Sequence, residues 1–189
     1  FVMVHVGDAD MPLDRLTDML RPGDVVTHAF RHQGGVVGVD RHVLDGVREA
    51  RERGVLFDVG HGAGSFSFDT AERALAEGFA PDNISSDISL VSIEGPVFDL
   101  LTTLSKFIHL GLSLDEVIRL STVTAAGIMG MAGRLGSLQV GAEGDVAVLR
   151  LDEGKFTFTD AEGVSVEGRQ RLGHVHTVKG GRLYRPWLK

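Results

Sequence analysis

Apolar and polar positions alternate along the first 110 residues in two patterns. Short runs of β-branched and aromatic residues are followed by segments in which apolar residues recur every three or four positions. This order is typical of successive βα units around a parallel sheet. Asp10 is expected to cap the first helix, and Gly23, Gly54 and Gly78 to end the first three. The pattern predicts strands at residues 1–5, 25–30, 55–59 and 84–86, and helices between residues 10 and 23 and at about 40–53, 70–77 and 96–109.

The pattern changes after residue 111. Ser113 followed by Glu116 is typical of a capping box, which predicts a helix through Leu120, and a second short helix is expected at about 124–131. The remaining chain is predicted to form a small β domain, with a boundary near residue 138. Its expected strands, separated by glycines, cover residues 146–151, 155–159, 174–179 and 182–184.

Composition narrows the classes of protein. With 43% hydrophobic and 24% charged residues, the chain can bury a sizeable core, and its net charge of −7 disfavours nucleic acid as a partner. No apolar run approaches the ~20 residues that a membrane helix needs. The absence of cysteine excludes a disulfide framework, a thiolate nucleophile and a Cys-based zinc site, and we expect a cytoplasmic protein. Phe1 opens a strand-like run, from which we expect that the given sequence begins inside a longer protein.

Histidine and aspartate recur at the ends of the predicted strands. His5 ends the first strand, His28 lies in the second and Asp87 follows the fourth. Because parallel strands bring their carboxyl ends to one edge, we expect these side chains to converge. Imidazole nitrogen and carboxylate oxygen suit Zn²⁺ or a similar divalent ion. Taken singly, each residue is more often structural, but together they favour a metal site.

The third strand leads into a glycine-flanked histidine, His61, between Gly60 and Gly62. Glycines at these positions allow the backbone to approach a ligand closely, so we assign His61 to substrate contact. His174 and His176 form a His-x-His in the β domain, which we interpret as surface or structural, with metal binding as the lesser alternative. The same interpretation covers the remaining histidines His32, His42 and His109, and the acids Asp8, Asp10, Glu49 and Glu52 are expected to be caps or solvated positions.

Several segments together resemble the amidohydrolase superfamily. The closest branch is that of the amidohydrolase/deacetylase metallohydrolases, which are related to dihydroorotases. The resemblance implies an α/β fold that corresponds to the C-terminal half of a TIM-type (β/α)8 barrel, strands five to eight, over residues 1–138. Residues 139–189 then correspond to the C-terminal part of a small β-sandwich. The resembling segments are residues 4–7, 23–28, 57–62 and 84–87 in the barrel, and 135–138, 140–141, 144–149 and 178–182 beyond it.

The resemblance also implies a chemistry. His5 and His28 would bind one metal of a binuclear pair, and Asp87 would bind the other and act as general base. A divalent metal, here zinc, lowers the pKa of bound water from about 15.7 to about 7 and polarises a carbonyl, while a carboxylate moves the proton. The implied activity is hydrolysis of an amide or ester bond in a small molecule, of the deacetylase, N-acyl amino acid or cyclic amide type.

The chain departs from the family in its extent. The family's first-strand His-x-His and its bridging lysine have no counterpart, and a complete barrel typically needs about 250 residues. We therefore expect an N-terminal half supplied in cis or in trans, and a homo-oligomer. Because half a barrel exposes strand edges, residues 1–189 alone are expected to self-associate. The alternative is a non-catalytic assembly or regulatory subunit that keeps the barrel geometry.

Overall fold

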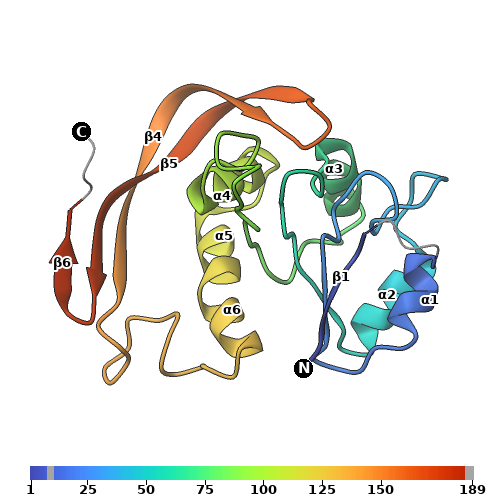
Figure 1. Cartoon of the computed structure of the whole chain (residues 1–189), viewed down its shortest axis with the longest axis horizontal. Coiled ribbons are helices and arrows are strands. Elements are labelled where there is room, and N and C mark those ends of the chain that lie inside the picture. Colours follow the sequence, from blue (N-terminus) through green and yellow to red (C-terminus); the bar gives the residue numbers. More distant parts are fainter. Residues whose placement is uncertain (8–10, 186–189) are drawn as a thin grey trace.

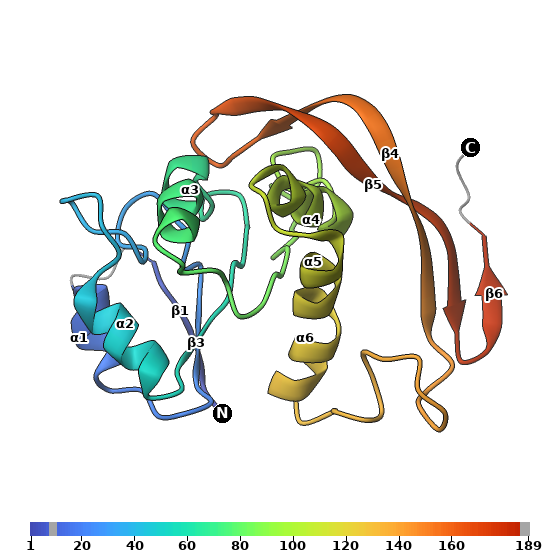
Figure 2. The same cartoon turned by 180° about the vertical axis from the view of Figure 1, so that it is seen from behind.

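The computed structural model describes residues 1–7 and 11–185. Figure 1 shows a small parallel sheet at the N-terminal end, a central group of helices, and a long antiparallel hairpin that arches over that group. The view from behind gives the same order, with α4, α5 and α6 between the two sheets (Figure 2). None of the helices in the described ranges is long and apolar enough to cross a membrane.

Three strands form the parallel sheet in the order β1-β2-β3. They are shorter than the sequence predicts: β1 begins two residues later, β2 ends three residues earlier, and β3 is shortened at both ends. In the register, His5 is the partner of Thr27, so the ends of β1 and β2 lie side by side. β2 is buried along its whole length. The strand bounds are Met3–His5 for β1, Val25–Thr27 for β2 and Leu56–Phe57 for β3.

The predicted fourth strand at residues 84–86 is wrong as a regular strand. The segment still runs beside the chain that follows β3, through bonds from His61 N–H to the Ser85 carbonyl at 3.2 Å and from Gly62 N–H to the Ser86 carbonyl at 3.0 Å. Gly60 and Gly62 adopt φ values of 46° and 51°, which no extended strand contains. These two turns interrupt the ladder and replace the strand end with an irregular loop.

The first helices confirm the βα order, with changed boundaries. α2 begins at Asp45 instead of about residue 40, because residues 36–44 form a turn closed by backbone bonds from Gly38 to His42 and from Leu44 to Val36. The cap predicted at Asp10 lies outside the described residues, as does Asp8, and α1 begins after Pro12. The bounds are Leu13–Thr17 for α1, Asp45–Glu52 for α2 and Phe68–Ala76 for α3.

The central helices are α4 (Leu100–His109), α5 (Leu114–Ser121) and α6 (Val123–Ile128). α4 begins later than predicted because the Asp99 carboxylate accepts the Thr102 N–H at 2.6 Å and so fixes the helix start. The capping box of Ser113 and Glu116 at the start of α5 is confirmed. α6 ends at Ile128, three residues before the predicted end at 131.

The C-terminal part is one long hairpin with a short third strand. Residues 146–151 and 155–159, predicted as two strands, are a single strand, β4 (Val146–Thr159). The reason is an irregularity in the register between Glu153 and Phe156, which absorbs the break expected at Gly154. β5 also begins nine residues earlier than predicted. Its bounds are Ser165–Lys179, and those of β6 are Arg182–Tyr184.

The core contains several phenylalanine rings beside aliphatic side chains, and it includes residues of the parallel sheet, α3 and α4. Phe107 on α4 is fully buried, with its ring 6.2 Å from that of Phe30 and 5.6 Å from that of Phe66. Phe158 and Leu172 of the hairpin belong to the same buried cluster. The hairpin therefore shares its core with the helices, and the domain boundary near residue 138 stays a prediction.

Candidate functional site

Two histidine rings meet at the carboxyl edge of the parallel sheet. His5 is the last residue of β1 and His28 is the first after β2. The Nδ1 atom of His5 lies 3.1 Å from Nε2 of His28, and the rings meet edge to face. The parallel register brings these two residues together, as the sequence pattern predicts.

A backbone carbonyl determines which ring nitrogen of His28 carries a proton. Its Nδ1 atom lies 2.6 Å from the carbonyl oxygen of Gly60, which can only accept a hydrogen bond. Nδ1 therefore carries the proton, and the lone pair is on Nε2, which faces His5. His28 reaches this orientation with a φ of 65°, a region that residues other than glycine rarely adopt. A strained backbone of this kind is typical of functional sites.

Asp87 completes the mouth of the site from the neighbouring loop. Its Oδ2 atom lies 4.0 Å from Nε2 of His28, and its side chain is 51% exposed. Gly62 lies directly beneath this carboxylate, and a Cβ atom there would come within 2.7 Å of Oδ2. The glycine predicted to permit close approach of a ligand thus permits close approach of Asp87. The sequence-predicted residues His5, His28 and Asp87 are therefore brought together.

A buried carboxylate lies behind this mouth. Asp58 is only 1% exposed and accepts three hydrogen bonds, from the Thr27 hydroxyl at 2.5 Å, the Ser85 hydroxyl at 2.7 Å and the Asn83 amide at 2.5 Å. No role for Asp58 was predicted. The signal was nevertheless visible, because an acidic residue stood between two apolar positions of a predicted buried strand.

Comparison with known proteins gives consistent matches. Residues 102–184 match the model of the amidohydrolase family. A deacetylase of Enterococcus faecalis is 33% identical over 186 residues, which are 97% of this chain and 50% of the deacetylase. The chain belongs to the amidohydrolase superfamily. It spans about half the length of the curated relatives that it matches.

Solved structures support the same family for this chain. The crystal structure of an adenine deaminase superposes with a TM-score of 0.94 at 33% identity, and that of a dihydroorotase with a TM-score of 0.87 at 32% identity. In both cases the match covers 97% of this chain and 50% of the other. The α/β fold is thus confirmed as one that these neighbours share over half of their chains. The assignment to barrel strands five to eight stays a prediction.

Amidohydrolases are generally dependent on divalent metals, and the two histidines fit such an ion. Two nitrogens bound to one tetrahedral zinc lie about 3.3 Å apart, given Zn–N distances of about 2.0 Å. The His5 and His28 nitrogens are 3.1 Å apart, and His28 donates its other N–H to a carbonyl, as metal-bound histidines usually do. Among the described residues, however, no three His, Asp or Glu side chains are close enough to form a complete site.

His61, predicted to contact substrate, is fully buried. Its ring stacks on Phe66 with centroids 4.7 Å apart. The Nδ1 atom lies 2.9 Å from the Gly62 carbonyl oxygen, and Nε2 lies 2.6 Å from the ammonium nitrogen of Lys106. Both ring nitrogens are therefore engaged within the protein, and substrate contact stays a prediction.

Lys106 was not predicted to have any special role, because one lysine in an amphipathic helix is normally solvated. It is fully buried here and also donates to the carbonyl oxygens of Pro96 at 2.9 Å and Thr159 at 2.7 Å. Burial lowers the pKa of Lys106 to about 8, although the Asp160 carboxylate opposes this. Burial, reinforced by the Lys106 ammonium, lowers the pKa of His61 to about 4.

The other histidines lie apart from this arrangement. His42 contacts Glu77 at 2.9 Å, and the His109 ring packs between Phe68 and Phe158. In β5, His174 is exposed and contacts the Thr177 hydroxyl at 2.9 Å. The interpretation of these histidines as surface or structural residues stays a prediction.

The burial of neutral His61 predicts a loss of stability in acid. The unfolded ring protonates near pH 6.5 and the folded ring only near pH 4, so the unfolded state binds more protons between these values. The free energy of unfolding is therefore expected to fall by about 3 kcal/mol as the pH decreases from 6.5 to 4. Urea unfolding at a series of pH values measures this decline.

A His61→Gln variant provides the comparison, because it lacks the titrating ring. It is expected to lose less stability than the parent over the same pH range, whereas His174→Gln at an exposed position is expected to follow the parent. Equal declines in the parent and His61→Gln would show that His61 does not contribute.

Proposed function

We propose that this chain carries part of the active site of a metal-dependent hydrolase that cleaves an amide or ester bond in a small molecule. A deacetylase, acting on an N-acyl amino acid, an N-acyl amide or a cyclic amide, is the preferred type. The observation that carries the proposal is the 3.1 Å approach of the His5 and His28 nitrogens, with the Asp87 carboxylate 4.0 Å from His28. The deacetylase relative supports the reaction class.

The three side chains have different proposed roles. His5 and His28 would hold the ion through Nδ1 and Nε2, and the exposed Asp87 would accept a proton from water and deliver it to the leaving group. When bound, the metal supplies water of lowered pKa and polarises the scissile carbonyl. The substrate contact assigned to His61 would require its ring to separate from Lys106, and it remains part of the proposal.

Further strands are proposed to complete the barrel. β1 lies at one edge of the described sheet, where its outer side is available for pairing. We propose that the N-terminal half of the barrel, in the same polypeptide or in another, pairs there and adds the ligands for a binuclear zinc pair. Self-association through this edge is the proposed origin of a homo-oligomer, and a cytoplasmic location remains part of the proposal.

Metal binding tests the proposal directly. The purified chain, stripped of metal and titrated with zinc, is expected to bind close to one ion, as measured by calorimetry and elemental analysis. His5→Ala and His28→Ala are each expected to weaken zinc binding at least tenfold, while His174→Ala leaves it unchanged. A parent chain that binds no zinc, or a His28→Ala variant that binds it equally, would contradict the proposal and favour the non-catalytic assembly subunit.

A further inference from the structure

We propose that Asp58 is a positioning residue that orients His28 for metal binding, acting through Ser85 and Gly60. The inference rests on the proposed function, because it assigns His28 as a metal ligand. It extends that function to the buried carboxylate of Asp58.

The surroundings of Asp58 indicate a role beyond packing. A buried carboxylate lowers stability unless hydrogen bonds compensate for its lost hydration. Asp58 receives three such bonds, and all three come from neutral groups on Thr27, Asn83 and Ser85. Thr27 is the residue directly before His28, while the other two belong to the segment that leads to Asp87. Asp58 therefore joins the two parts of the chain that carry candidate site residues.

The hydroxyl group of Ser85 connects Asp58 to the Gly60 backbone. It has one hydrogen, which it donates to Asp58 at 2.7 Å, so it must act as acceptor toward the Gly60 N–H at 3.2 Å. The carbonyl of Gly60 then accepts the Nδ1 proton of His28 at 2.6 Å. The Ser85 hydroxyl thus holds the Gly60 backbone, and the Gly60 carbonyl keeps the proton of His28 on Nδ1, which leaves the lone pair on Nε2, facing His5.

Gly60 allows the backbone to pass close to both Thr27 and His28. A Cβ atom at this position would lie 2.1 Å from the Thr27 hydroxyl and 2.9 Å from Nδ1 of His28, so only glycine fits between them. Its φ of 46° also favours glycine. The Gly60 backbone therefore lies between Ser85 and His28, and it is bonded to both side chains.

Asp24 offers a matched control in the same sheet. It is also buried, and it precedes β2, at the end opposite to His28. Its carboxylate accepts the backbone N–H groups of Val2 at 2.8 Å and Arg21 at 2.9 Å. Asp24→Asn therefore removes a buried, hydrogen-bonded carboxylate without contact to any candidate ligand.

The experiment compares Asp58→Asn, Ser85→Ala and Asp24→Asn in the full chain. We expect the zinc dissociation constant, measured by calorimetry, to rise about 10- to 100-fold in Asp58→Asn, by a smaller factor in Ser85→Ala, and not at all in Asp24→Asn. In the metal-free chain, the NMR signal of the His28 Nδ1 proton is expected to be protected from exchange in the parent and in Asp24→Asn. It should be lost or broadened in the other two variants.

Ser85→Ala decides the outcome if Asp58→Asn does not fold. Parent-like zinc affinity and an unchanged His28 proton signal in folded Ser85→Ala would overturn the inference, as would an equal loss of affinity in Asp24→Asn. If the parent chain binds no zinc, the proposed function fails, and the proton signal of the metal-free chain still decides whether Asp58 and Ser85 orient His28.

Discussion

Asp87→Asn is expected to lower turnover about 10²- to 10⁴-fold, the range in which a general base contributes to catalysis. The amide has nearly the shape of the carboxylate but cannot accept the proton of an attacking water. Asp87 is half exposed, so the exchange does not disturb a packed region. Its φ is 45°, a conformation that asparagine also tolerates. The fold is therefore expected to stay intact.

The measurement uses the chain together with the rest of its barrel, assayed with N-acetyl amino acids and cyclic amides on which the parent is active. Asp69→Asn is the matched control, since that carboxylate is also 51% exposed and pairs with Arg41 and Arg73. We expect parent-like turnover for Asp69→Asn and an unchanged unfolding transition for both variants. Full activity of Asp87→Asn would refute its role as general base.

Phe107→Ala is expected to lower the free energy of unfolding by about 3–5 kcal/mol, as large-to-small changes of buried phenylalanine usually do. The Phe107 ring lies between Phe30, which follows β2, and Phe66, which supports the His61 ring. Its removal leaves a cavity where α4 meets the sheet. Against a typical total stability of about 5–15 kcal/mol, this loss is severe.

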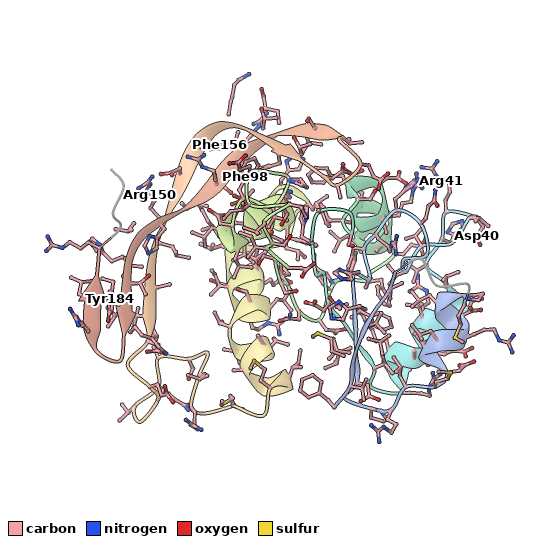
Figure 3. All side chains as sticks on the ribbon, in the orientation of Figure 1. Asp40, Arg41, Phe98, Arg150, Phe156 and Tyr184 are labelled. Carbon is pink, nitrogen blue, oxygen red and sulfur yellow. The ribbon has the colours of Figure 1, made fainter. Side chains whose placement is uncertain are left out.

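Urea unfolding of the parent and variant measures this effect. Phe98→Ala is the control, because this ring is half exposed and lines a surface pocket together with Phe156 of the hairpin (Figure 3). The control is expected to change stability by no more than about 0.5 kcal/mol. If Phe107→Ala cost as little, α4 would not be held by the aromatic core.

The sequence alone was sufficient for most of the order of the elements and for the proximity of His5 and His28. Periodicity identified the βα units, and the Ser113 capping box was confirmed because its signal lies within four residues. His5 and His28 could be paired because parallel strands align their carboxyl ends without knowledge of any side chain. The predicted strand at 84–86 is wrong. The segment beside it, residues 60–62, turns at Gly60 and Gly62 and so cannot form a regular ladder with it.

Only the tertiary structure decided which polar residues are buried and what they bind. The acceptors of Lys106 come from residues 61, 96 and 159, and Asp160 accepts the N–H of Phe68, 92 positions away. Likewise, Asp58 collects donors from two other segments of the chain. A local pattern records the periodicity and the ends of an element. Whether a charged group can be buried depends instead on partners that come close only when distant segments pack together.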